Sequence, residues 1–265
     1  MAEKIFFIGV GNMGGAILKG LLHSKKAPND ILFFEPNDST AHEFEALGAI
    51  RVQGFDDGIR DAKTAFICIK PQIFKMVASP WLSILQKMPP KTFISIMAGV
   101  SSETLKTHLG NHEALRVMPN LPLTVGKGAV ALATDNVSES TLTLAESIFK
   151  NVGVTVRVQE SWMDAVTGLS GSGPAYVFEF IDGLIMGGEK MGLTRSVAKE
   201  LALTTLEGSI ELLKCSGKEP SVLTEMVSSP GGTTIAGLKV LEEADFKAVL
   251  VRTVEAAAKR SKELG

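Results

Sequence analysis

The chain has 265 residues, with 27 Lys and Arg against 29 Asp and Glu and a formal net charge of −2. This length is typical of one or two domains, and the balanced charge argues against a nucleic-acid-binding protein that relies on a basic surface. Two Cys are too few for a disulfide scaffold or a cysteine-based zinc site, and four His and one Tyr leave little for a histidine base or a metal centre. We therefore expect no metal site.

Nothing in the chain predicts export or membrane insertion. The apolar run at residues 5–8 meets Gly9 at once, so it is too short for the core of a signal peptide. No stretch of about 18 consecutive apolar residues occurs. These features predict a cytoplasmic protein with neither a membrane nor a nucleic acid as partner.

Taken in chain order, the first half alternates apolar runs with helical periodicity. Strands are predicted at 4–10, 31–34, 64–69 and 92–97, with further strand-like segments at 114–118, 129–133 and 154–158. Helices are predicted at 12–25 and 38–47. This alternation is typical of βαβ units, so we expect an α/β domain of the Rossmann type, with a doubly wound and mostly parallel sheet, over residues 1–159.

After residue 160 the pattern changes to long helical periodicity. Helices are predicted from Pro174 to about Met191 and at 194–214, 220–227, 234–243 and 246–262. No linker rich in Ser, Gly or Pro separates the two halves. We therefore predict an all-helical domain over residues 160–265, joined rigidly to the first.

The first turn carries the pattern G-x-G-x-x-G, formed by Gly9, Gly11 and Gly14 with Asn12 and Met13 between them. It directly follows a predicted strand and opens a predicted helix, which is the context of a dinucleotide-binding loop. Gly9 permits the turn, Gly11 lets a pyrophosphate approach, and Gly14 lets helix and strand pack closely. Free N–H groups at the helix start attract the phosphates.

Glu35 ends the second predicted strand, 21 positions after Gly14. A carboxylate there accepts hydrogen bonds from the adenosine ribose and repels the 2′-phosphate of NADP. No Arg directly follows it, although Asn37, Ser39 and Thr40 can donate to a phosphate. We hypothesise use of both NADH and NADPH, with NADH no worse than NADPH.

Three further segments follow predicted strands, where a doubly wound sheet binds its ligands. They supply the remaining predicted cofactor contacts, namely Ile69, Lys70, Pro71, Ala98, Gly99 and Asn120. Ala98 and Gly99 are small enough for a flat nicotinamide ring. Arg116 precedes Asn120 among apolar neighbours, and ligand binding and a structural ion pair remain equally open for it.

Two segments of the helical half are rich in Gly, Ser and Thr, at 167–176 and 227–234. The second opens a helix, and consecutive N–H groups at such a start form a site for an anion such as a small carboxylate. An ordinary turn between helices is the alternative for each. Gly183, Gly187 and Gly188 share one helix face, which favours either a dimer interface or close core packing.

These motifs, with those at 69–72 and 116–120, resemble the pyrroline-5-carboxylate reductase family along the whole chain. The segments at 164–176 and 227–234 carry the specific part of the resemblance, since many dehydrogenases share the glycine loop. The resemblance implies reduction of 1-pyrroline-5-carboxylate to L-proline by hydride transfer from NADPH or NADH. It also implies a helical dimerisation domain, hence a homodimer, with dimers assembling into larger rings.

The resemblance further implies the substrate site. The substrate carboxylate is expected in the loop of Ser229, Gly231, Gly232, Thr233 and Thr234, with the catalytic Thr234 hydroxyl facing the ring nitrogen. Glu160 matches a position near the substrate. Relatives carry a small neutral residue where this chain has Glu35, and an Asn near Phe55, so strict NADP dependence is not expected.

A cyclic imine can bring its own proton, which suits a chain poor in His and Tyr. For the single Tyr176 we favour packing over proton transfer. One alternative is a 3-hydroxyacid dehydrogenase of the 6-phosphogluconate type, which generally uses a Lys on the first long helix of its second domain, whereas Lys190 lies late in that helix. The other is a dinucleotide sensor without catalysis, for which the loop at 229–234 has no use.

Overall fold

A computed structural model describes residues 3–24 and 26–264. It divides the chain into two compact units. The first runs to Ser172 and includes the chain from Glu255 onward, and the second is Gly173–Val254. The predicted boundary at 159/160 thus differs from this division by thirteen residues, and the end of the last helix belongs to the first unit.

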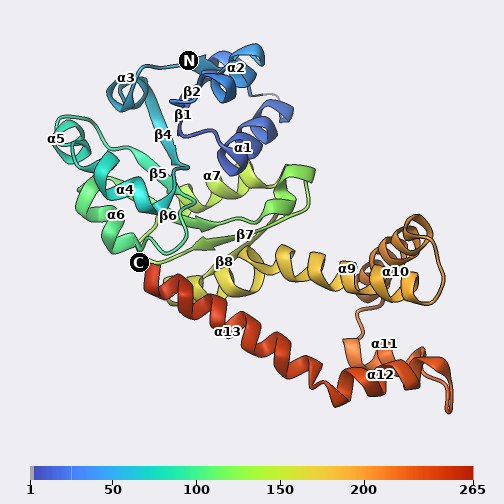
Figure 1. Cartoon of the computed structure of the whole chain (residues 1–265). Helices are drawn as coiled ribbons and strands as arrows, with labels where there is room; N and C mark the ends of the chain where they lie inside the picture. Colours follow the sequence, from blue (N-terminus) through green and yellow to red (C-terminus); the bar gives the residue numbers. More distant parts are fainter. Residues whose placement is uncertain (1–2, 25, 265) are drawn as a thin grey trace. The chain divides into compact units, whose positions relative to one another are not determined.

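The first unit is built on one eight-stranded sheet in the order β3-β2-β1-β4-β5-β6-β7-β8. Its strands are β1 (Lys4–Ile8), β2 (Ile31–Phe34), β3 (Ile50–Arg51), β4 (Ala62–Ile67), β5 (Thr92–Ser95), β6 (Glu113–Met118), β7 (Gly128–Ala133) and β8 (Gly153–Val158). Neighbours pair in parallel except β6 with β7. The predicted Rossmann-type, mostly parallel sheet is confirmed, as Figure 1 shows.

The helices of this unit are α1 (Asn12–His23), α2 (Asp38–Ala46), α3 (Phe55–Asp61), α4 (Pro71–Ala78), α5 (Trp81–Leu85), α6 (Ser102–Leu109), α7 (Glu139–Phe149) and α8 (Met163–Val166). Sequence periodicity predicted α1 and α2, while β3 and the helices from α3 to α8 were not predicted. The last predicted residue of the first helix, Lys25, lies outside the described residues.

Buried side chains on alternating strand positions divide the core into two layers. Phe7 and Phe33 belong to the layer covered by α1, α2 and α7, whereas Phe6 and Ile8 belong to the layer covered by α3, α4, α5 and α6. All four side chains are almost inaccessible to water. Both faces of the sheet are therefore covered, which explains why its strands read as continuous apolar runs.

A connection of short helical turns follows β8. It contains a 3₁₀ turn (Glu160–Trp162), α8 and a π-helical segment (Thr167–Gly171). Met163 packs with Ala131, Ala133 and Val158 of β7 and β8. This packing onto the sheet is the physical reason that the compact unit extends to Ser172.

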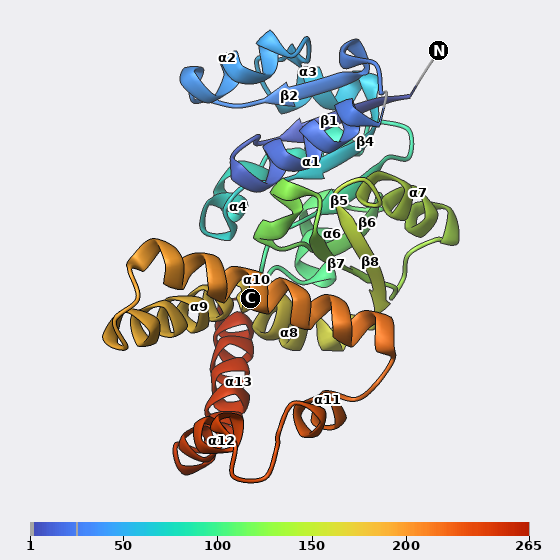
Figure 2. The same ribbon diagram turned by 90° about the vertical axis from the view of Figure 1, so that its right-hand side faces the viewer.

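The second unit holds α9 (Gly173–Lys190), α10 (Arg195–Ser216), α11 (Pro220–Met226), α12 (Thr233–Glu243) and the first part of α13 (Phe246–Leu264). Figure 2 shows α9 beside α10, and a small core of Ile185, Ala198 and Ala202 joins them. The expectation that the chain is helical after residue 160 is confirmed for the described residues.

Many large apolar side chains of the second unit are exposed in the single chain. Those of α9 and α10 include Phe178, Met186, Leu201 and Leu212, each more than half exposed. Apolar exposure on this scale is typical of an interaction surface rather than of a monomer's exterior.

Candidate functional site

The glycine loop follows β1 and opens α1, as predicted. Gly9 has a φ of 89° and donates its N–H to the Phe34 carbonyl at 2.9 Å. A Cβ at Gly11 would meet nothing within 4 Å, whereas a Cβ at Gly14 would lie 2.6 Å from the Gly9 oxygen and 2.8 Å from Cβ of Cys68. The three glycines thus provide a turn, an open approach and a close helix–strand contact, which are the three properties that a pyrophosphate loop requires.

The N-terminus of α1 is free to receive an anion. Gly11 is its N-cap, no side chain caps the helix, and its first turn holds no acidic residue. Asn12 is exposed and Met13 is half-buried. The unsatisfied N–H groups of the first turn and the helix dipole both favour phosphate at this position.

Glu35 lies just past β2 with its carboxylate held by two backbone N–H groups. Oε2 accepts from Val10 at 3.1 Å, and Oε1 accepts from Asn37 at 3.0 Å. The side chain of Asn37 caps α2 by accepting from the Thr40 N–H at 3.0 Å. The contact with Val10 places the Glu35 carboxylate at the glycine loop, which suits the predicted ribose contact.

Sequence reasoning missed one cation at this edge. Arg51 of β3 donates from Nη2 to the Glu35 carbonyl and to Oδ1 of Asp38, each at 2.8 Å. Its Cα is paired with that of Phe33 in β2. Because β3 has only two residues and no alternating pattern, its pairing carried no signal in the sequence.

The loops after β4 and β5 lie at the same edge, since both strands are parallel to β1. Lys70 is exposed and stands as N-cap of α4, followed by Pro71 at the first helical position. Ile69 and Ala98 are half-buried, and Gly99 has a φ of 75°. The structure therefore brings these predicted positions to the edge where the glycine loop lies, and their cofactor contacts stay predictions.

Asn120 is buried, with its side chain bonded to backbone on both sides. Oδ1 accepts from the Ala129 N–H at 2.9 Å, and Nδ2 donates to the Ser170 carbonyl at 3.1 Å. These bonds join the start of β7 to the π-helical segment. A cofactor contact made by this side chain would compete with both hydrogen bonds, so the backbone of Asn120 is better placed to make it. The predicted cofactor contact of Asn120 stays a prediction.

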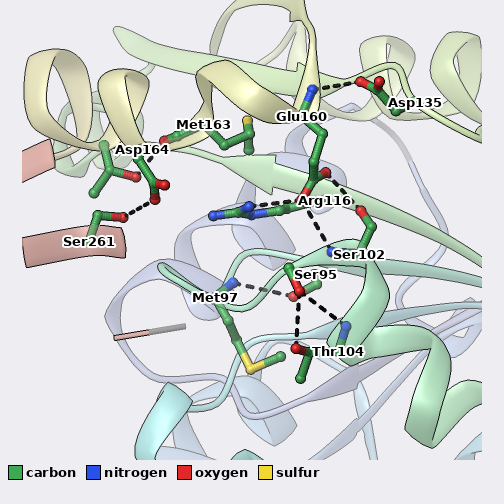
Figure 3. A network of polar contacts seen from close by, with 12 residues as sticks. Ser95, Met97, Ser102, Thr104, Arg116, Asp135, Glu160, Met163, Asp164 and Ser261 are labelled. Carbon is green, nitrogen blue, oxygen red and sulfur yellow. Dashed lines mark hydrogen bonds and ion pairs between the residues drawn. The ribbon is translucent and has the colours of Figure 1, made fainter. Parts of the chain in front are cut away.

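Arg116 and Glu160 form the ion pair that the sequence left open. Figure 3 shows the Arg116 guanidinium against the Glu160 carboxylate, 2.8 Å from Nη1 to Oε1, with Arg116 almost fully buried. The N–H and hydroxyl of Ser102 donate to the same carboxylate at 3.1 and 2.7 Å. Glu160 thus joins β6 to the start of α6, and its predicted place near the substrate stays a prediction.

The same view shows how the connection after β8 is attached. The Glu160 N–H donates to Oδ2 of Asp135 at 2.6 Å, and the Ser261 hydroxyl donates to Oδ1 of Asp164 at 2.7 Å (Figure 3). The second bond ties the end of α13 to α8.

Burial raises the pKa of the Cys68 thiol behind the glycine loop, which makes it unsuitable as a nucleophile.

The second unit carries the predicted anion loop between α11 and α12. Gly231 has a φ of 70°, and the Gly232 N–H donates to the Ser229 carbonyl at 2.9 Å. α12 starts at Thr233 with Gly232 as N-cap, no side-chain cap and no acidic residue in its first turn. The N–H groups of Thr233 and Thr234 are therefore available to a carboxylate, as the sequence predicts.

The small residues of α9 have different surroundings. A Cβ at Gly188 would lie 2.9 Å from Cβ of Ala198, so Gly188 serves the contact between α9 and α10. Gly183 and Gly187 have nothing within 4 Å of such a Cβ. Tyr176 is half-buried on α9. Core packing therefore accounts for Gly188, while the other two lie on an open face.

The described residues also bear on membrane insertion and metal binding. Among residues 3–24 and 26–264, no helix combines the length and apolarity needed to cross a membrane. The described part of the chain also holds no group of three His, Cys, Asp or Glu side chains placed to bind a metal ion.

Two family models match the chain. One, described as pyrroline-5-carboxylate reductase dimerisation, matches residues 160–264, and the other, described as NADP oxidoreductase coenzyme F420-dependent, matches residues 4–99. The chain is 39% identical to pyrroline-5-carboxylate reductase of Synechocystis over 100% of this chain and 99% of that protein. It is 37% identical to that of Pisum sativum, over 97% and 94%.

Solved structures agree. A pyrroline-5-carboxylate reductase from Coxiella burnetii superposes with a TM-score of 0.90 at 32% identity, covering 100% of this chain and 99% of that one. Plasmodium falciparum pyrroline carboxylate reductase, solved with NADP bound, gives 0.88 at 31%, covering 99% and 98%. A 3-hydroxyisobutyrate dehydrogenase of Mycobacterium tuberculosis gives 0.53 at 16% over 73% and 67%, which shares the fold alone. The hydroxyacid dehydrogenase alternative is therefore not favoured.

Proposed function

Because the chain belongs to the pyrroline-5-carboxylate reductase family, we propose that it reduces 1-pyrroline-5-carboxylate to L-proline, with NADH or NADPH as hydride donor. This is the last step of proline biosynthesis. The observation that carries the substrate class is the uncapped N-terminus of α12, where the consecutive N–H groups of Thr233 and Thr234 are open to a carboxylate.

The cofactor fits the residues of the first unit. The open space at Gly11 admits the pyrophosphate, and the Glu35 carboxylate accepts from the ribose hydroxyls. The loops at Lys70 and Gly99 stand at the same edge of the sheet for the nicotinamide half. When bound, the dihydronicotinamide supplies a hydride.

The substrate loop positions the imine and holds its nitrogen. The N–H groups that open α12 bind the carboxylate, assisted by the Ser229 hydroxyl. The Thr234 hydroxyl bonds the ring nitrogen, which carries its own proton as an iminium. Reduction then forms one C–H bond at the imine carbon and breaks the C=N π bond, whose electron pair stays on nitrogen. The protein needs position and electrostatics rather than a strong acid.

Two assays test this function. Oxidation of NADH with 1-pyrroline-5-carboxylate is followed by absorbance, and intact NADH binding without oxidation would favour the sensor instead. Thr234→Ala should lower kcat/KM by roughly 10–100-fold, since one lost hydrogen bond costs about 1.4–2.7 kcal/mol. Thr224→Ala, whose hydroxyl only donates to the Pro220 carbonyl at 2.9 Å, is the matched control. Wild-type kinetics in Thr234→Ala would remove the hydroxyl from the mechanism.

The carboxylate loop has its own test. Compared with 1-pyrroline-5-carboxylate, 1-pyrroline lacks only the carboxylate, so the wild type should reduce it with a kcat/KM lower by roughly 100-fold or more. Equal kcat/KM values for both imines would show that the loop does not bind the carboxylate.

Assembly and location complete the proposal. The exposed apolar side chains of α9 and α10 support a homodimer formed through the second unit. From the family resemblance we propose in addition that dimers assemble into a larger ring. Light scattering of the purified chain measures both. A cytoplasmic location is part of the same proposal.

A further inference from the structure

Arg51 is a cation hydrogen-bonded to Glu35, the residue just past β2. Its guanidinium donates to the Glu35 carbonyl and to Asp38, both from Nη2 and both at 2.8 Å. The Glu35 carboxylate is directed toward the glycine loop by its bond from Val10. Arg51 therefore contacts Glu35, the residue proposed to bind the adenosine ribose.

The 2′-phosphate of NADPH needs a positive charge at this edge, and Arg51 can provide it. Glu35 and Asp38 both carry negative charge there, and a 2′-phosphate adds further negative charge. Asn37, Ser39 and Thr40 can hydrogen-bond a phosphate, but their side chains are neutral and do not balance its charge. NADH needs no such compensation, since a carboxylate suits its ribose hydroxyls.

Arg51 has donors to spare. A guanidinium carries five N–H groups, and within residues 3–24 and 26–264 the bonds of Arg51 to Glu35 and Asp38 both come from Nη2. The Asp38 side chain is 77% exposed, against 23% for Arg51. An ion pair with one partner this exposed is weak, so a phosphate can displace Asp38 from the guanidinium.

We propose that Arg51 is the specificity-determining residue that admits NADPH beside Glu35, exchanging the Asp38 carboxylate for the 2′-phosphate. Arg is suited to this exchange because its planar fork binds phosphate oxygens in pairs. With NADH bound, Arg51 stays with Asp38 and Glu35 accepts from the ribose. The inference rests on the proposed adenosine site at Glu35, and it gives the chain use of both cofactors.

Binding of nucleotide fragments tests Arg51 without turnover. The dissociation constants of 2′,5′-ADP and 5′-AMP are measured by calorimetry for the wild type and for Arg51→Gln. Loss of the charge-assisted bonds should weaken 2′,5′-ADP by about 10- to 100-fold and 5′-AMP by no more than about twofold. Asp38→Asn should strengthen 2′,5′-ADP by about threefold or more, because the competing carboxylate is gone.

Controls separate this role from folding and from charge alone. Lys63→Gln removes the same charge from an exposed ion pair with Glu3, at the N-terminal end of β4 and away from the cofactor edge. It should leave the affinities for both fragments unchanged. Arg51→Lys keeps the charge and should restore part of the 2′,5′-ADP affinity. The proposal is overturned if Arg51→Gln weakens the binding of 2′,5′-ADP and 5′-AMP equally, or if it weakens the binding of neither.

The outcome is independent of the proposed reaction. A chain that binds 2′,5′-ADP through Arg51 but does not reduce the imine upholds this inference and overturns the proposed function. If the wild type reduces the imine but Arg51→Gln binds 2′,5′-ADP like the wild type, the proposed function is upheld and this inference is overturned.

Discussion

Replacing Gly14 by Ala should destabilise the protein, because the helix and the glycine loop leave no room for a methyl group there. The added Cβ would lie 2.6 Å from the Gly9 carbonyl oxygen and 2.8 Å from Cβ of Cys68, and the first of these atoms is backbone. α1 must therefore move away from the loop. Overpacking of this kind costs about 1–3 kcal/mol, and at about 2–4 °C per kcal/mol Tm should fall by about 2–12 °C.

Gly11→Ala is the matched comparison, since the same methyl group there meets nothing within 4 Å. The backbone at Gly11, with φ −61° and ψ −164°, is open to Ala. Its stability should stay within about 0.5 kcal/mol of wild type. The methyl group instead occupies the space through which the pyrophosphate approaches, so NADH affinity should fall by about tenfold or more.

Thermal unfolding by circular dichroism and NADH titration by fluorescence, applied to both variants, measure the two effects separately. A Gly14→Ala protein whose Tm stays within about 1 °C of wild type would refute the packing argument. A Gly11→Ala protein that binds NADH like the wild type would refute the assignment of the pyrophosphate to this loop.

Three further changes test the polar network of the first unit by urea unfolding or pH-dependent melting. Glu160→Ala should lower the free energy of unfolding by about 3 kcal/mol, because it leaves the buried Arg116 unpaired, whereas a loss below about 1 kcal/mol would mean that water replaces the carboxylate. Asn120→Ala should lower the free energy of unfolding by about 2–4 kcal/mol, since two backbone groups lose their hydrogen-bond partner. An unchanged urea midpoint would show that these two hydrogen bonds do not stabilise the protein. Burial alone would raise the pKa of Glu113, but hydrogen bonds from Thr141 and Ser138 outweigh it and lower the pKa. This stabilisation is present above the ordinary carboxyl pKa of about 4.3 and is lost as pH falls through the lowered pKa. The Tm difference between wild type and Glu113→Gln should therefore shrink as pH falls below about 4, and a constant difference would contradict the linkage.

Local patterns predicted the elements whose signal lies within a few residues. The apolar run before Gly9 and the periodicity after it predicted β1 and α1. The glycine spacing predicted the turn at Gly9, the open space at Gly11 and the close packing at Gly14. Short helices such as α5, with five residues, were missed because too few turns exist for a period to appear.

The domain boundary shows a different limit. Composition changes at residue 160, and the family model also begins there. The compact unit nevertheless continues to Ser172, because Met163 packs onto β7 and β8. A change in periodicity marks where strands stop, whereas a compact unit ends where packing against the sheet stops.

By itself, the sequence determined the Rossmann-type first half and the helical second half, and it predicted the dinucleotide loop and an anion loop at Ser229–Thr234. Each depends on the conformation of consecutive residues. Only the tertiary structure decided that Arg116 pairs with Glu160, that Asn120 is bonded to backbone, and that Arg51 lies on Glu35. These partners stand 44, 50, 9 and 16 positions apart along the chain. Strand order and register bring them together, and a pattern of neighbouring residues carries no information about either.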